Sequence, residues 1–228
     1  MPADTAIPLK LAVLLAMAGA FVGRSADVIA AGPQLEPGQI DIEQSRVYVH
    51  VYKTGLGHEH GVEGQLKSGW VSLPATKNAG EIIFDMASFS ADTDAARRVV
   101  GLEGTTDANT RVEVTHNMLG PDVLDVKKFP TATFKINSVR RLPARRPNAA
   151  QQFELAGDFT LHGTTKAVAL VADASTANGL MRLQGSFSIL QSDYGITPFS
   201  KALGAVGVAD RLTISGDLRV ATGAGTSR

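Results

Sequence analysis

The sequence predicts an all-β protein, an antiparallel barrel of eight strands with one or two inserted helices. The first observation is alternation: in residues 151–173, apolar Phe153 and Leu155 alternate with polar Gln152 and Glu154, which is typical of a strand with one buried face. The second is that eight segments read this way and no strand–helix unit repeats along the chain. Antiparallel strands in this number can close into a barrel, which removes exposed edges.

Three of the strands are expected before residue 90. They are placed at 45–52, from Val62 to about Pro74, and at 82–86, because apolar and polar residues alternate in each. Their expected inner faces carry Val47, Val49, Val51, Val62, Gly64, Leu66, Ser68, Trp70, Ile82, Phe84 and Met86.

The pattern changes after Ser90. The cluster Asp92-Thr93-Asp94 can cap a helix, and Ala95 to Leu102 carries helix-forming residues. Asp107 or Asn109 can cap a second helix that reaches about Leu119. Strand is the alternative for this second segment, because it contains Val and Thr residues that favour strands.

Five more strands are expected after residue 130, at 131–137, 151–161, 166–172, 181–189 and 211–220. The second and third form a hairpin whose turn contains Gly163, which is free to take a positive φ. Asn178-Gly179 predicts another tight hairpin turn. Residues 194–208 are rich in glycine and are expected to form a loop with one helical turn.

The composition narrows the class of protein. The chain has 228 residues, of which 44% are hydrophobic, so one domain with a sizeable core is expected. The 22 basic residues balance the 22 acidic ones, which argues against a nucleic-acid-binding surface. The chain has no cysteine, so disulfides and cysteine-ligated metal sites are excluded.

The N-terminus predicts export. Lys10 precedes an apolar run from Leu11 to Gly23 that is too short for a membrane span of about 20 residues, and small residues precede Ala31. Residues 1–30 are therefore expected to be a cleaved signal peptide, 31–38 a linker, 39–221 the barrel domain and 222–228 a disordered tail. The mature protein is expected to be periplasmic or secreted.

The interior of the barrel poses the functional question. The inner faces carry Gly64, Gly157, Gly185 and Gly216 in mid-strand. These glycines can reflect coiling of the sheet, a close backbone approach or a bulge, and their missing side chains can also leave a tunnel. A hollow interior would suit a long hydrocarbon chain, because the expected lining has almost no charge. The expected lining residues are Val47, Val49, Leu66, Phe84, Met86, Phe134, Phe153, Leu155, Phe159, Phe187 and Leu218.

An ordered set of motifs runs along the chain: Ser45-Arg46-Val47, Gly64, the segment 129–134 (FPTATF), the segment 157–166 (GDFTLHGTTK) and Tyr194-Gly195-Ile196. Over residues 39–220 this set resembles the YceI-like polyisoprenoid-binding family. The resemblance implies an extended lipocalin-like barrel with helices inserted between two strands. It also implies export and the binding of an isoprenoid or similar lipid, and it implies no catalysis. One departure is the segment 94–100, which lacks the acidic partner of an Arg-Asp pair common in the family.

Polar residues near the expected barrel mouth leave several interpretations open. His58 and His60 would share one face of an extended segment, as two ligands of a metal site would, with His50, His116 or His162 as a third. They could equally lie in an exposed loop, or bind the headgroup of a ligand together with Arg97. The arginines of residues 140–146 could touch anionic lipid at a membrane surface, or simply be solvated.

The sequence therefore predicts an exported carrier that holds an isoprenoid, a quinone-like molecule or a related long apolar chain. It is not expected to be an enzyme or to bind nucleic acid, and no cofactor is expected beyond that lipid. Two alternatives remain: a metal-assisted hydrolase that uses His58 and His60, and a filled barrel that serves as an interaction module.

Overall fold

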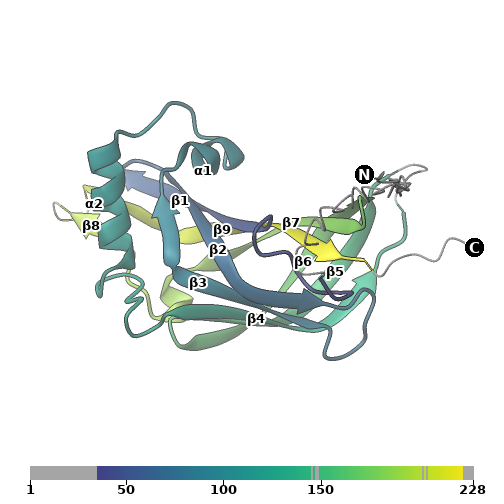
Figure 1. Cartoon of the computed structure of the whole chain (residues 1–228). Helices are drawn as coiled ribbons and strands as arrows, with labels where there is room; N and C mark the ends of the chain where they lie inside the picture. The colour runs from purple at the N-terminus through teal and green to yellow at the C-terminus, as the bar shows by residue number, and fades with distance from the viewer. Residues whose placement is uncertain (1–34, 145, 147–148, 202, 204, 223–228) are drawn as a thin grey trace, which may run out of the picture. The chain divides into compact units, whose positions relative to one another are not determined.

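Eight long antiparallel strands form a closed barrel in the computed structural model, which describes residues 35–144, 146, 149–201, 203 and 205–222 (Figure 1). The strand β1 pairs with β2 on one side and with β9 on the other, and these pairings close the sheet. The eight-stranded antiparallel barrel with two short helices is thus confirmed. The strands and helices are β1 (Arg46–Gly55), β2 (His60–Val71), β3 (Gly80–Ala91), α1 (Asp94–Val99), α2 (Ala108–Leu119), β4 (Thr131–Arg141), β5 (Gln151–Leu161), β6 (Thr164–Ala177), β7 (Leu180–Leu190), η1 (Ser192–Tyr194), β8 (Ser200–Lys201) and β9 (Val206–Ala221).

Three predicted regions lie mostly or wholly outside the described residues. They are the expected signal peptide (1–30), residues 31–34 of the linker and residues 223–228 of the tail. No helix in the described part of the chain combines the length and apolarity needed to cross a membrane.

The two predicted hairpin turns are present. His162 and Gly163 connect β5 to β6 with φ of 50° and 77°, and Asn178 and Gly179 connect β6 to β7 with φ of 52° and 75°. Positive φ at both central residues is the backbone form that matches the twist of paired strands, and it favours Gly and Asn.

Both helices begin at caps that the sequence indicated. The Thr93 hydroxyl accepts a hydrogen bond from the Ala96 amide at the start of α1, and Asp107 accepts from the Asn109 and Thr110 amides at the start of α2. The first helix ends at Val99 rather than continuing to Leu102. Both helices stand at one end of the barrel, where α2 packs beside β3 and α1 beside β2 (Figure 1).

Two inner-face expectations in β2 are wrong, because Ser68 and Trp70 are both exposed. Trp70 is 45% exposed, whereas its neighbour Val71 is buried. The pairing of β2 with β3 shifts register between Leu66 and Ser68, so an extra residue there reverses which side chains face inward. Because side chains alternate with period two, a bulge of one residue turns every later side chain to the opposite face.

The end of the barrel opposite the helices is closed by the chain before β1. The Ile40 amide donates to the Gly69 carbonyl, and Ile40 bridges to Val220 of β9. Ile40 is buried at 2% exposure, and it packs with Val71 and Ile136 in the hydrophobic core. We call the half of the barrel at this end the filled half.

Candidate functional site

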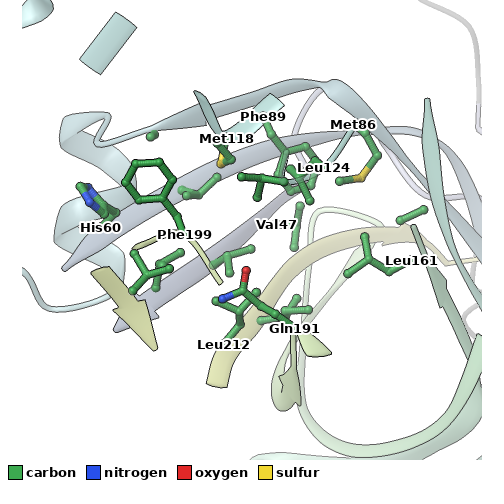
Figure 2. Close-up of a pocket in the computed structure, with 18 of the residues that line it drawn as sticks. Val47, His60, Met86, Phe89, Met118, Leu124, Leu161, Gln191, Phe199 and Leu212 are labelled. Atoms are coloured by element: carbon green, nitrogen blue, oxygen red, sulfur yellow. The ribbon is translucent and has the colours of Figure 1, made fainter. Parts of the chain in front are cut away.

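An apolar pocket occupies the half of the barrel under α2 (Figure 2). It encloses about 1120 Å³ of space between atoms, open solvent at its mouth included. Three of the 22 lining residues have polar side chains, namely His60, Asn117 and Gln191. The lining contains no Asp, Glu, Lys or Arg. The apolar lining residues are Val47, Val49, Val51, Val62, Phe84, Met86, Phe89, Ala91, Val114, Met118, Val123, Leu124, Ala132, Phe159, Leu161, Phe199, Val208, Leu212 and Ile214.

The expected lining residues divide between the pocket and the filled half. Val47, Val49, Phe84, Met86 and Phe159 line the pocket. The other six, Leu66, Phe134, Phe153, Leu155, Phe187 and Leu218, do not line it.

The direction of each strand explains this division. The strand β5 starts in the filled half, where Phe153 and Leu155 are buried in the core, and it ends at the pocket with Phe159 and Leu161. Along β9 the order is reversed: Ile214 lines the pocket, and later residues belong to the filled half. Alternation identifies the inner face of a strand but not which end of that face is hollow.

Aromatic rings form the boundary between the two halves. Phe159 and Phe84 line the pocket, with ring centroids 6.2 Å apart. The ring of Phe159 also meets Phe187 at 5.4 Å, and Phe187 in turn lies 6.3 Å from Phe134 of the filled half. We call Phe84, Phe159, Phe187 and Phe134 the aromatic floor of the pocket.

Three of the four mid-strand glycines mark close contacts rather than hollow space. A Cβ atom on Gly157 would lie 2.1 Å from the Lys135 carbonyl oxygen, and one on Gly64 would lie 2.4 Å from the Phe89 ring. A Cβ on Gly185 would lie 2.7 Å from Leu170. At Gly216 the nearest atom would be Leu218 Cγ at 3.9 Å. Neighbouring backbone approaches closely at Gly157 and Gly185, and the Phe89 ring occupies the space beside Gly64, so the pocket arises elsewhere.

Part of the lining comes from segments that alternation cannot identify. Val114 and Met118 of α2 are four residues apart, so they lie on the same face of the helix and cover the pocket. Gln191 and Phe199 follow β7 in a segment without regular strands. The helical spacing was a usable signal for α2, whereas the placement of Gln191 and Phe199 depends on how the chain returns to β9.

A polar network lies behind one wall of the pocket. His60 Nδ1 is 2.8 Å from Asp92 Oδ2, and Oδ1 of the same carboxylate accepts from the Gly61 amide at 3.2 Å and from Arg97 Nη1 at 3.3 Å. The Asp92 side chain is 2% exposed. Burial alone would raise the pKa of Asp92, but the hydrogen bond and charge of His60, the hydrogen bond from Gly61 and the charge of Arg97 together hold it below its ordinary value. The carboxylate is therefore ionised at neutral pH.

The three candidate headgroup residues occupy different positions. His60 lines the pocket, and His58 is exposed in the segment before β2. Arg97 donates to the Glu103 and Gly104 carbonyls as well as to Asp92, so it braces the network behind His60 and does not line the pocket.

The arrangement of histidines does not form a metal centre among the described residues. No group of three His, Asp or Glu side chains is placed to hold a metal ion in that part of the chain. His50, a candidate third ligand, hydrogen-bonds Glu59 at 2.8 Å, and His162 Nδ1 lies 3.2 Å from the Tyr194 carbonyl.

Comparisons with known proteins agree with this fold. A family model described as the YceI-like domain matches residues 39–220. No curated protein sequence matches the chain significantly. Among solved structures, BcnA from Burkholderia cenocepacia is similar with a TM-score of 0.53 and 18% identity, covering 79% of this chain and 99% of that one. A polyisoprenoid binding domain from Saccharophagus degradans, implicated in plant cell wall breakdown, is similar with a TM-score of 0.51 and 13% identity, covering 82% and 100%.

Proposed function

The chain belongs to the YceI-like domain family, and from that premise we propose that it is an exported carrier that holds a long apolar chain, such as a polyisoprenoid or a quinone with an isoprenoid tail, in the pocket under α2. The observation that carries the proposal is the apolar lining of a pocket inside an otherwise closed barrel. Burying apolar surface is worth about 25 cal/mol per Å², so a hydrocarbon tail would enter without any charged partner.

The chemical character of the pocket supports a lipid rather than a small polar ligand. Ligand pockets are mostly apolar, with a few polar groups that orient the ligand. This pocket has the same character, with His60, Asn117 and Gln191 as its polar groups. The S. degradans relative is described as a polyisoprenoid binding domain, which makes an isoprenoid chain the first ligand to test.

Solvent extraction and mass spectrometry of the purified protein test the proposal. The protein, prepared without detergent, is expected to retain a lipid or to take up an added isoprenoid alcohol. Ala132→Phe places a ring in the pocket and should reduce uptake, whereas Ala169→Phe on the exposed face of β6 should not. If the unaltered protein takes up no apolar chain, or if both variants bind as well as it does, the carrier function is wrong.

Export is tested separately. Protein recovered from the cell envelope or the medium is expected to begin at Ala31, because residues 1–30 are proposed to be a signal peptide. N-terminal sequencing that finds Met1 on the mature protein would contradict this part of the proposal.

A further inference from the structure

The polar atoms of the pocket point to a preference for one kind of headgroup. His60 Nδ1 faces Asp92, which is ionised and therefore accepts hydrogen bonds without donating any. Nδ1 must then carry the ring hydrogen. A neutral imidazole with its hydrogen on Nδ1 has a lone pair and no hydrogen at Nε2.

Nε2 of His60 is available to a ligand. No group among the described residues hydrogen-bonds this nitrogen, and His60 is one of the residues that line the pocket. Figure 2 shows His60 at the edge of the pocket beside Phe199. The pocket therefore presents a hydrogen-bond acceptor at this point.

Gln191 adds a second acceptor. Its side-chain nitrogen donates to the Ala209 carbonyl at 2.8 Å, and because a carbonyl oxygen only accepts, the orientation of the amide is fixed. The amide oxygen then faces the pocket, as Figure 2 shows, although Gln191 itself is 95% buried with an exposure of 5%. Asn117 can both donate and accept, so it does not set a preference.

We infer that this pocket selects, among long apolar chains, those whose polar end donates a hydrogen bond, such as a long-chain alcohol or a quinol. The inference rests on the proposed carrier function and specifies its ligand. A phosphate, a carboxylate or a quinone carbonyl would meet lone pairs at His60 and Gln191, and the guanidinium of Arg97 is committed to Asp92 and two carbonyls. The lining contains no lysine or arginine that could replace it.

Three probes that share one hydrocarbon chain test the inference: farnesol, farnesyl methyl ether and farnesyl phosphate. Uptake of the ether measures the apolar pocket alone, and the ratio of alcohol to ether affinity measures the donated hydrogen bond. We expect farnesol to bind about fivefold to tenfold more tightly than the ether, and the phosphate to bind no more tightly than the ether.

Asp92→Asn tests whether the tautomer of His60 sets the preference for the alcohol, an effect that a purely structural role of Asp92 would not produce. The Asp92 oxygen that accepts from Gly61 and Arg97 must remain an oxygen, so the new amide nitrogen faces His60 and donates to Nδ1. His60 then carries its hydrogen on Nε2 and becomes a donor. We expect the ether and the alcohol to bind with similar affinity in this variant, and ¹⁵N spectra of the imidazole to show the change of tautomer.

His60→Asn is the second variant, in case Asp92→Asn does not fold. The asparagine amide can still donate to Asp92 while Nε2 is removed, so ether binding should persist and the preference for the alcohol should fall to about twofold or less. His116→Phe, on the exposed side of α2, is the control and should keep the preference.

Each outcome decides a different point. Equal binding of alcohol and ether to the unaltered protein, or tighter binding of the phosphate than of the alcohol, would overturn the inference while leaving the carrier function intact. If none of the three probes binds, the carrier function itself fails, and the inference fails with it.

Discussion

The rings of Phe159 and Phe187 meet edge to face, with centroids 5.4 Å apart and planes inclined at 78°. Phe159 lines the pocket and Phe187 does not. This contact therefore lies at the floor of the pocket, where we expect it to limit how deep a bound hydrocarbon chain reaches.

Removing the deeper ring should lengthen the pocket. Phe187→Ala is expected to cost about 3 kcal/mol of stability and to shift the preferred ligand toward longer chains, because the floor loses the ring between Phe159 and Phe134. A series of alcohols of increasing chain length measures the shift. Phe153→Ala, in the filled half, is the control: it should destabilise the protein without changing the preferred chain length. If both variants shift the preferred chain length, or if neither does, the aromatic floor does not limit how deep the ligand reaches.

Two mid-strand glycines, Gly157 of β5 and Gly216 of β9, should respond differently to the same substitution. Gly157→Ala is expected to lower the free energy of unfolding by about 2 kcal/mol or more, because the new methyl would press on the Lys135 carbonyl. Gly216→Ala should cost less than about 0.5 kcal/mol, since its methyl would meet only Leu218 Cγ at 3.9 Å. Urea unfolding of both variants measures the difference, and equal costs would contradict it.

The outer face of β9 should make stability depend on pH. Burial alone would raise the pKa of Asp217, but hydrogen bonds from Arg182 and Arg219 and their charges bring it below the ordinary 3.8. A carboxyl whose pKa is lowered by folding stabilises the protein above its unfolded pKa, and that contribution is lost as the pH falls through the folded value.

Asp217→Asn should therefore be less stable than the unaltered protein at pH 7, and the gap should narrow as the pH falls below about 4. Thermal unfolding across this range measures the gap. Asp173→Asn, on the exposed face of β6, is the control and should change stability by less than about 0.5 kcal/mol at pH 7. A gap for Asp217→Asn that stays constant with pH would exclude the ion pairs as its cause.

The bulge in β2 can be tested by substituting each of two adjacent residues separately. Trp70→Ser should cost about 1 kcal/mol or less, because nearly half of the side chain is already in water. Val71→Ala should cost more, about 2 kcal/mol, since Val71 is buried at 2% exposure. The reverse order, measured by urea unfolding, would place the tryptophan in the core as strict alternation predicted.

The sequence by itself determined the number and type of the strands, the two hairpin turns and the helix caps. These features depend on local chemistry: Asn178-Gly179 supplies the positive φ of a tight turn, and Asp107 accepts from the amides that follow it. The periodic apolar residues also identified the inner face of most strands, including Phe84 and Phe159 in the pocket. Ser68 and Trp70 were placed on the wrong face, because a bulge is a property of how two strands pair.

Only the tertiary structure decided where the barrel is hollow and what faces the hollow. Leu155 and Leu161 read alike in the sequence, yet Leu155 is part of the filled half and Leu161 lines the pocket. Ile40 closes one end from before β1, while α2 bridges the other without filling it. His60 and Asp92 meet across 32 positions of the chain. Whether a space stays empty depends on the volumes of side chains brought together from distant segments, and alternation along one strand carries no information about those volumes.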